Sequence, residues 1–296
     1  MEIVFLGTGC PVVSTERYGP AQLILSEAAK ILVDCGSGVT QRLVAAGTPG
    51  CALDALLLTH LHSDHLVDLY QLVVSSWHQG RERPLPVYGP PGTRRYVEGL
   101  MALWEPELSQ RIAHEKRPST AALQVEVTEI SGGEVLAFDG LEVRVVEVDH
   151  KPVRHAFGFV FEAAGQKLAL SGDTRRCAAL IEAARDADLL VHEVFVHREM
   201  PVIPGVRSAE TVANVAAYHT LSGEVGKIAS EAGVKALALT HFVPPAADRE
   251  ALLAEVAADF AGPLVLAEDL LRIDLSRRRV VVGKAVLSLG RRADYL

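Results

Sequence analysis

Apolar residues in the first third of the chain occur in short runs separated by turn residues. Such runs predict strands, because a strand buried on both faces is apolar throughout and a half-buried strand alternates. We place these strands at 2–6, 21–26, 30–34, 56–58 and 84–88. Helical spacing predicts helices at 39–46, from Asp64 to about 77, and after 93. Residues 105–120 lack a clear period and are interpreted as a lid or an insertion.

The rest of the chain repeats this order of strands followed by helices. Strands are predicted at 125–130, 134–138, 141–148, 156–162, 167–170, 189–191 and 236–240. Helices are predicted at about 176–185, 209–219, 223–231 and 248–260, before two or three C-terminal strands. The pattern indicates a mixed α/β protein. Two mixed sheets packed face to face with helices outside would account for it as one domain spanning residues 1–296.

Composition narrows the class of protein. A hydrophobic fraction of 49% is enough for a sizeable core. The net charge of −8 and a pI near 5.8 weigh against a nucleic-acid binder, which usually carries a basic face. The four cysteines are scattered without a CxxC pair, as expected for reduced thiols. Neither a signal peptide nor an apolar run of ~18 residues is present, so we expect a cytoplasmic protein without a membrane partner.

Four potential metal ligands lie within six residues directly after the apolar run 56–58. They are His60, His62, Asp64 and His65. On an extended segment, His60 and His62 point to the same side, and Asp64 can cap the helix that follows. A strand end, a tight loop and a helix start would crowd these side chains into one pocket. Imidazole and carboxylate together suit zinc or a similar divalent ion.

Three further candidate ligands each follow a predicted strand, where a site between two sheets would collect them. They are His150, Asp173 and His241. His155 is a weaker rival for His150, because it lies inside the entry to a strand. Asp34, at another strand end, either orients a ligand histidine or forms an Asx turn. Four arginines lie around the strand and turn at 84–93. They form either a rim for an anionic substrate or an ordinary solvated surface: Arg81, Arg83, Arg94 and Arg95.

The His-x-His-x-Asp-His string at 60–65 resembles the signature of the metallo-β-lactamase superfamily. The resemblance implies a four-layer αβ/βα sandwich and two divalent ions, Zn²⁺ first and Mn²⁺ as the alternative. The first ion would be held by His60, His62 and His150. The second would be held by Asp64, His65 and His241, with Asp173 bridging. Redox di-iron relatives carry Glu at the position of His62, so hydrolysis is favoured over oxygen chemistry.

Two more motifs resemble the ribonuclease Z branch of that superfamily. Residues 192–195 (His-Glu-Val-Phe) are similar to its His-Glu-Ala-Thr motif, and 219–220 (His-Thr) to its His-x-Thr motif. The family's motif Glu and His handle protons, which implies this role for Glu193 and His219. The alternative is a purely structural pair. The sequence departs from the family at Val194-Phe195 and in the spacing of Thr220.

Family members that process tRNA usually carry a long flexible arm, in many bacterial forms between the third ligand histidine and the bridging aspartate. Only 23 positions separate His150 from Asp173, enough for one hairpin and no arm. With an acidic net charge as well, tight tRNA binding is not expected. The resemblance also implies a homodimer.

The implied activity is hydrolysis of a phosphodiester, either an RNA 3′ end or a small phosphodiester. A hydroxide held between the two metals would attack phosphorus, with Asp64, Glu193 and His219 as catalytic residues. Alternatives on the same ligand set are a lactonase, a β-lactamase-like enzyme or an arylsulfatase-type enzyme. A non-catalytic metal-binding protein is the alternative from a different class.

Overall fold

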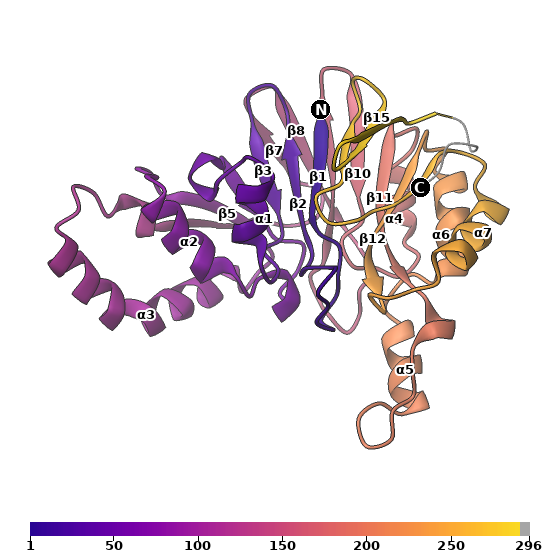
Figure 1. Cartoon of the computed structure of the whole chain (residues 1–296), viewed down its shortest axis with the longest axis horizontal. Coiled ribbons are helices and arrows are strands. Elements are labelled where there is room, and N and C mark those ends of the chain that lie inside the picture. The colour runs from indigo at the N-terminus through magenta and orange to yellow at the C-terminus, as the bar shows by residue number, and fades with distance from the viewer. Residues whose placement is uncertain (291–296) are drawn as a thin grey trace.

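The computed structural model describes residues 1–290, in which two mixed β-sheets lie face to face between outer helices (Figure 1). The first sheet has the order β16-β15-β14-β1-β2-β3-β4-β5-β6. Its strands are β1 (Glu2–Gly7), β2 (Ala21–Leu25), β3 (Lys30–Val33), β4 (Ala55–Leu57), β5 (Leu85–Gly89), β6 (Val125–Glu129), β14 (Arg272–Asp274), β15 (Arg279–Val282) and β16 (Ala285–Ser288). Strands β3 to β6 run parallel, whereas the others pair antiparallel.

The second sheet has the order β13-β12-β11-β10-β9-β8-β7. Its strands are β7 (Val135–Phe138), β8 (Leu141–Glu147), β9 (Phe157–Ala163), β10 (Gln166–Leu170), β11 (Leu189–Phe195), β12 (Leu237–Val243) and β13 (Leu264–Leu266). Strands β10 to β13 are parallel and apolar almost throughout, because both of their faces are covered. Two parallel blocks therefore bring several strand ends to one edge of the sandwich.

Helices cover the outer face of each sheet (Figure 1). On the first sheet lie α1 (Val39–Ala45), α2 (Leu69–His78) and α3 (Thr93–Glu115); on the second lie α4 (Ala178–Ala183), α6 (Ser222–Glu231) and α7 (Arg249–Asp259). Short 3₁₀ turns are η1 (Gly50–Ala52), η2 (Ser63–His65), η3 (Ala121–Leu123) and η4 (His197–Glu199). The remaining helix, α5 (Ala209–Ala216), projects from the body of the molecule together with the loop before it.

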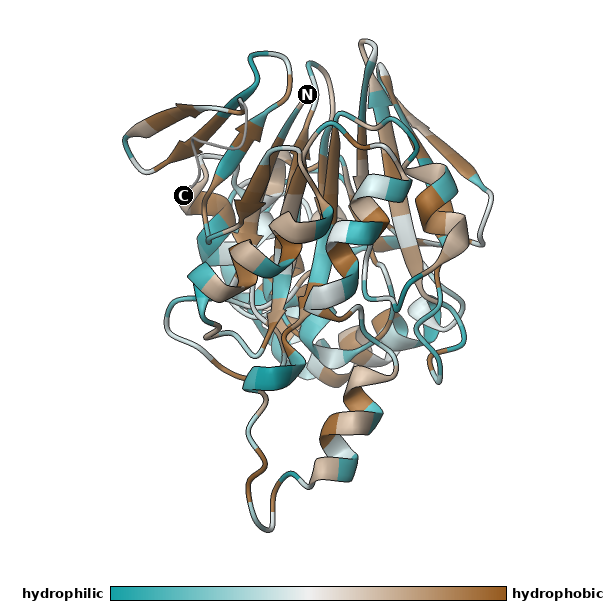
Figure 2. Cartoon of the chain, turned by 90° about the vertical axis from the view of Figure 1, so that its right-hand side faces the viewer, coloured by the Kyte–Doolittle hydropathy of each residue, from teal (hydrophilic) through white to brown (hydrophobic). Residues whose placement is uncertain are grey.

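Three apolar layers hold the sandwich together. The central one lies between the sheets and is rich in aromatic residues of β9, including Phe157, Phe159 and Phe161. Two others lie between each sheet and its helices, around Leu43 and Leu72 on one side and around Ile228 on the other. Figure 2 shows hydrophobic residues along the strands and mixed surfaces on the helices. The described helices include none long and apolar enough to span a bilayer.

The predicted architecture is confirmed, since two mixed sheets with outer helices form the four layers. The prediction for 105–120 was wrong for residues 105–115, which continue α3. Arg111 contacts Glu107 and Glu115 at i±4, and Trp104 stacks on Tyr70 of α2 at 4.5 Å. These pairs stabilise a helix that has no pronounced apolar stripe, which is why its period was not visible.

Four element boundaries also differ from the prediction. The helix after the histidine string begins at Leu69 behind Asp68, so Asp64 lies in the turn η2 and does not cap it. Strands β11 and β12 extend past their apolar runs and include Glu193 and His241. Helix α5 ends at Ala216, before His219. The chemistry-bearing residues thus belong to strands and turns more than to helices.

Candidate metal centre

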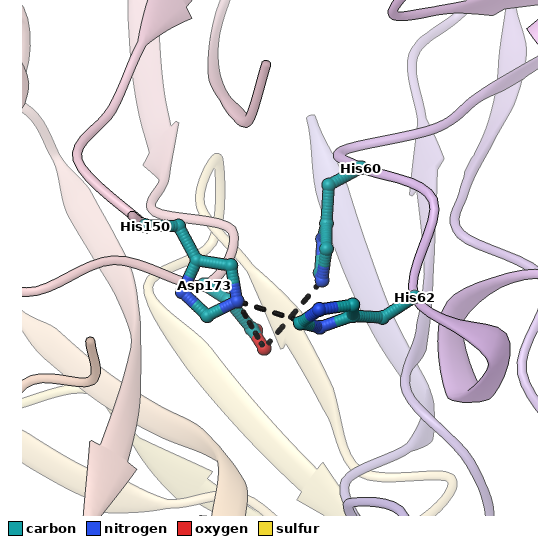
Figure 3. A group of neighbouring side chains, drawn as sticks. All are labelled: His60, His62, His150 and Asp173. Carbon is teal, nitrogen blue, oxygen red and sulfur yellow. Dashed lines mark hydrogen bonds and ion pairs between the residues drawn. The ribbon is translucent and has the colours of Figure 1, made fainter. Parts of the chain in front are cut away.

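The predicted ligands converge at the edge of the sandwich where β4, β8, β10 and β12 end. His60 and His62 follow β4 of the first sheet, whereas His150 follows β8 and Asp173 follows β10 of the second. Figure 3 shows these four side chains pointing toward one another from the two sheets. The site is therefore built across the interface between the sheets, from residues up to 181 positions apart in sequence, His60 and His241.

One carboxylate oxygen, Asp173 Oδ2, lies at the middle of the cluster. It is 3.9 Å from His60 Nε2 and 4.0 Å from His150 Nε2 on one side. On the other side it is 3.4 Å from both His65 Nε2 and His241 Nε2. Asp173 is therefore the residue that both halves of the cluster share.

The second half of the cluster contains Asp64, which lies between two histidines. Asp64 Oδ2 is 3.5 Å from His65 Nε2 and 3.4 Å from His241 Nε2. The potential ligand atoms of these three residues lie within 4.8 Å of one another, as do those of His60, His62, His150 and Asp173. The structure thus brings all seven predicted ligands together in two adjoining groups.

The donor atoms fit divalent ions. His60 Nε2, Asp64 Oδ2, His65 Nε2 and His241 Nε2 are buried without a hydrogen-bond partner, although buried polar atoms are normally satisfied. Two ligands bound at 2.0–2.1 Å around a tetrahedral ion stand roughly 3.3 Å apart. The observed separations of 3.4–4.0 Å are close to this value. The cluster is a site for divalent metal.

Groups behind the ligands fix which ring nitrogen faces the centre. His65 Nδ1 is 2.8 Å from Asp34 Oδ2, and His60 Nδ1 is 3.0 Å from Thr59 Oγ1. His150 Nδ1 donates to the backbone carbonyl of Tyr218 at 2.8 Å. Each contact leaves Nε2 directed at the cluster, as partners of metal-binding histidines usually do. Of the two roles considered for Asp34, orienting a histidine is the one that the structure shows.

Two backbone features place ligands where a regular strand would not. His241 has φ +46° and occupies a bulge, since Glu193 pairs with Thr240 but Val194 pairs with Phe242. A bulge re-aims a side chain, and here it turns the imidazole toward Asp64. Asp34 also has a positive φ, of 60°. Neither conformation is visible in the residue types themselves.

The surroundings of the cluster shift the pKa values of His60 and His65 in opposite directions. Burial and neighbouring histidines hold the pKa of His60 well below its usual range, which keeps the imidazole neutral as a ligand must be. Burial also acts on His65, but the carboxylates of Asp173, Asp34 and Asp64 outweigh it and raise the pKa of His65 well above normal. The carboxylates thus create strongly negative surroundings that attract cations.

Glu193 and His219 form a buried pair beside the cluster. His219 Nδ1 is 2.9 Å from Glu193 Oε1, which also accepts from the backbone N–H groups of Thr174 and Thr220. Burial alone would lower the pKa of His219, but the charge and hydrogen bond of Glu193 raise it to about 9. One potential ligand atom of His219 lies within 4.8 Å of those of Asp173 and His241. His219 therefore lies next to the metal cluster, with its Nδ1 held by Glu193.

The other candidates lie elsewhere. His155 is exposed and belongs to none of the metal-ligating groups among the described residues. Arg81 is buried and donates to the carbonyls of Leu53 and Pro84 at 2.8 and 2.9 Å, whereas Arg83 pairs with Asp54. Arg81 is therefore used inside the protein, and Arg83 in a surface ion pair.

The sequence interpretation missed a projecting segment beside the site. Residues 196–217 connect Glu193 to His219 and contain η4, a narrow turn closed by an Ile203–Arg207 bridge, and α5. Figure 1 shows this segment leaving the body of the molecule. As predicted, the interval between His150 and Asp173 holds one hairpin, β9–β10, with short connections and no arm. The signal for the projection was the 26-position gap between the two motif residues.

Comparison with known proteins identifies a matching family model and similar sequences. The family model described as "Anti-Pycsar protein Apyc1" matches residues 1–203. The chain is 38% identical over 284 residues to ribonuclease Z of Mycobacterium bovis (strain BCG / Pasteur 1173P2), covering 94% of this chain and 100% of that protein. Ribonuclease Z of Mycobacterium marinum is 37% identical over 283 residues, with the same coverage.

Solved structures show the same fold. The metallo-β-lactamase fold protein YhfI from Bacillus subtilis has a TM-score of 0.71 at 21% identity, covering 92% of this chain and 97% of its own. Short-form human tRNase Z has a TM-score of 0.68 at 22% identity, covering 93% and 99%.

The fold and the histidine–aspartate cluster define a metallo-β-lactamase-fold hydrolase. Within that class, the chain belongs to the ribonuclease Z family, and the Apyc1 family model also matches it over residues 1–203. The predicted activity class is thereby confirmed: this is a metal-dependent phosphodiesterase.

Proposed function

We propose that the chain hydrolyses RNA 3′ ends or small phosphodiesters with two zinc ions. The observation that carries this proposal is the position of the Glu193–His219 pair against a cluster of seven potential ligands. His60, His62 and His150 would hold one ion. Asp64, His65 and His241 would hold the other, with Asp173 between them. Mn²⁺ is the alternative metal, because the ligands are imidazole and carboxylate only.

When bound, the ions supply an activated water and positive charge that stabilises the phosphoryl oxygens. The residues of the chain provide the remaining steps. Asp34, Thr59 and the Tyr218 carbonyl keep the ligand imidazoles oriented. Burial of the cluster excludes bulk water, which strengthens every charge interaction within it.

The role proposed for His219 is to protonate the leaving oxygen. Its Nδ1 is engaged by Glu193, so Nε2 is the nitrogen available to a substrate. Glu193 holds the ring in place and keeps it protonated at neutral pH. A general acid beside the metals suits the alkoxide leaving group of a phosphodiester. Asp64 is proposed to act both as a ligand and in positioning the attacking water.

The relatives named ribonuclease Z support RNA as a substrate class. The 23-position interval without an arm supports short RNA ends or small phosphodiesters over an entire tRNA. We further propose that the chain acts as one domain, forms a homodimer and works in the cytoplasm. Exposed apolar side chains on α3, Leu103 and Trp104, offer a surface for a second copy.

A parallel turnover assay tests the proposal. Zinc- or manganese-loaded protein is given bis(p-nitrophenyl) phosphate, a short RNA with a 3′ extension, and a precursor tRNA. Turnover of the first two with weaker turnover of the third supports the proposal. Absence of hydrolysis of any phosphodiester by protein with two bound ions would overturn it.

A further inference from the structure

Tyr218 lies between the metal cluster and the Glu193–His219 pair. Its ring stands edge to face against that of His150, with the ring centroids 4.9 Å apart and the planes at 86°. Its centroid is also 4.7 Å from that of His219, with the planes at 45°. The backbone carbonyl of Tyr218 accepts from His150 Nδ1 at 2.8 Å. One residue therefore contacts both a proposed metal ligand and the proposed proton donor.

The side chain of Tyr218 is close to the cluster but remains open to solvent. The residue is half-buried, whereas the two histidines that it contacts are buried. Burial raises the pKa of its hydroxyl, and the carboxylates of Asp173, Asp64 and Glu193 raise it further. The hydroxyl is thus within electrostatic reach of the cluster, on a side chain that a substrate can touch.

The Tyr218 hydroxyl is also free to bind something outside the protein. Within residues 1–290 it makes no hydrogen bond. Other hydroxyls near the cluster are not available: Thr59 Oγ1 donates to a carboxylate, and the hydroxyls of Ser171 and Thr174 donate to backbone carbonyls. The hydroxyl of Thr240 belongs to a buried residue. Tyr218 is therefore the hydroxyl of this group that a substrate can reach.

The chemistry of the site gives such a donor a use. A phenolic O–H donates hydrogen bonds, and it stays protonated at neutral pH. During attack on a phosphate ester, negative charge is spread over the equatorial phosphoryl oxygens. A donor that is already fixed where this charge lies stabilises the transition state without reorganising. The contacts with His150 and His219 hold the Tyr218 ring in this way.

We infer that Tyr218 is a further catalytic residue, whose hydroxyl donates a hydrogen bond to a phosphoryl oxygen of the substrate held at the metal cluster. The inference rests on the proposed phosphodiesterase function and adds a residue to it. Tyr218 keeps its proton throughout, whereas His219 gives its proton to the leaving oxygen. The two neighbouring side chains thus serve different oxygens of one phosphate group.

The variant Tyr218→Phe tests the inference, because it removes the hydroxyl and keeps the ring. In the zinc-loaded protein, kcat for bis(p-nitrophenyl) phosphate should fall about 10- to 100-fold, as for loss of one hydrogen bond to a charged oxygen. KM should change less than kcat, because the interaction is strongest in the transition state. Metal content should stay at that of the original protein. Calorimetry should show about tenfold weaker binding of inorganic phosphate.

Tyr88→Phe is the matched control. Tyr88 is half-buried, its ring stands edge to face against Phe138 at 5.8 Å, and its hydroxyl makes no hydrogen bond within the described part of the chain. Phe138 pairs with Leu141, at the end of β8 far from His150. This variant should keep the kcat and the phosphate affinity of the original protein. An equal fall of kcat in both variants would overturn the inference.

Tyr218→Leu distinguishes the hydroxyl from the ring. It removes both, so its kcat should fall at least as far as that of Tyr218→Phe. If Tyr218→Leu loses turnover and Tyr218→Phe keeps it, the ring only supports its neighbours and the inference is wrong.

Turnover by the original protein separates this failure from failure of the proposed function. If it hydrolyses bis(p-nitrophenyl) phosphate and Tyr218→Phe does so equally well, the inference fails and the phosphodiesterase remains. If the original protein with two bound ions hydrolyses no phosphodiester, the proposed function fails, and the affinity for inorganic phosphate then decides. Weaker binding in Tyr218→Phe supports the role of the hydroxyl, and equal binding excludes it.

Discussion

The metal cluster and the groove of about 490 Å³ beside it, which is lined mainly by the loop that follows β1, are built in opposite ways. The cluster is buried, charged and held by groups from both sheets, so His60 and His241 have almost no exposure. The groove is open, apolar and formed largely by one loop whose tip, at Val13, touches little else. Changes in the cluster should therefore abolish the chemistry, whereas changes at the exposed loop residues Val12 and Val13 should leave the metal ligands in place.

The largest effect is expected from removing a cluster ligand. His62→Ala deletes one imidazole from the group with His150 and Asp173, so metal and turnover should be lost together. Metal content by mass spectrometry and turnover of bis(p-nitrophenyl) phosphate measure the two losses. Retained turnover in a variant depleted of metal would contradict the dinuclear proposal.

The next largest effect is expected from a change in the Glu193–His219 pair. Glu193→Gln keeps the size of the side chain but removes its charge, so turnover should fall about 100-fold or more, as for loss of a general acid. Metal content should stay near that of the original protein, because Glu193 is not among the proposed ligands. Loss of metal in this variant would make Glu193 structural.

The pH dependence of turnover tests the role of His219 as the proton donor. The pKa of His219 is raised to about 9, so the proton is present below pH 9 and is lost as the pH rises through that value. The rate should fall on the alkaline side near pH 9. In Glu193→Gln the pKa of His219 should drop and the fall should begin at lower pH. An unchanged alkaline limb in the variant would exclude His219 as the proton donor.

A smaller effect is expected from changing Asp34, which contacts the proposed ligand His65. Asp34→Asn keeps an oxygen near Thr59 but removes the charge beside His65. Metal affinity should weaken by about 10- to 100-fold, and excess zinc should restore turnover. Measured zinc affinity equal to that of the original protein would mean that Asp34 serves only the local backbone.

The cluster could be predicted from the sequence because its ligands are rare residue types placed directly after apolar strands. The spacing of His60 and His62 identified them as candidate ligands. Asp173 and His241 were identified by their positions at the ends of predicted strands. The two facing sheets place them together. The order of strands and helices indicated only a mixed α/β protein, and the resemblance to the metallo-β-lactamase superfamily implied the four-layer sandwich. The α/β fold class could be predicted from that order of strands and helices.

The rest depended on contacts that sequence does not encode locally. The bulge at His241, the Tyr218 carbonyl that accepts from His150, and the groove along residues 10–19 all arise from tertiary packing. The helix through 105–115 is stabilised by ion pairs and a stacked Tyr70, with no apolar stripe to reveal it. Function beside the cluster was therefore harder to anticipate than the cluster.

The central claim is that two bound ions and the cluster together carry out phosphodiester hydrolysis. Stepwise addition of zinc to metal-free protein, with bound metal and bis(p-nitrophenyl) phosphate turnover followed in the same samples, tests it most directly. The account predicts that turnover appears with bound zinc and reaches its maximum at two ions per chain. Full turnover in the metal-free protein, or none at two bound ions, would contradict it.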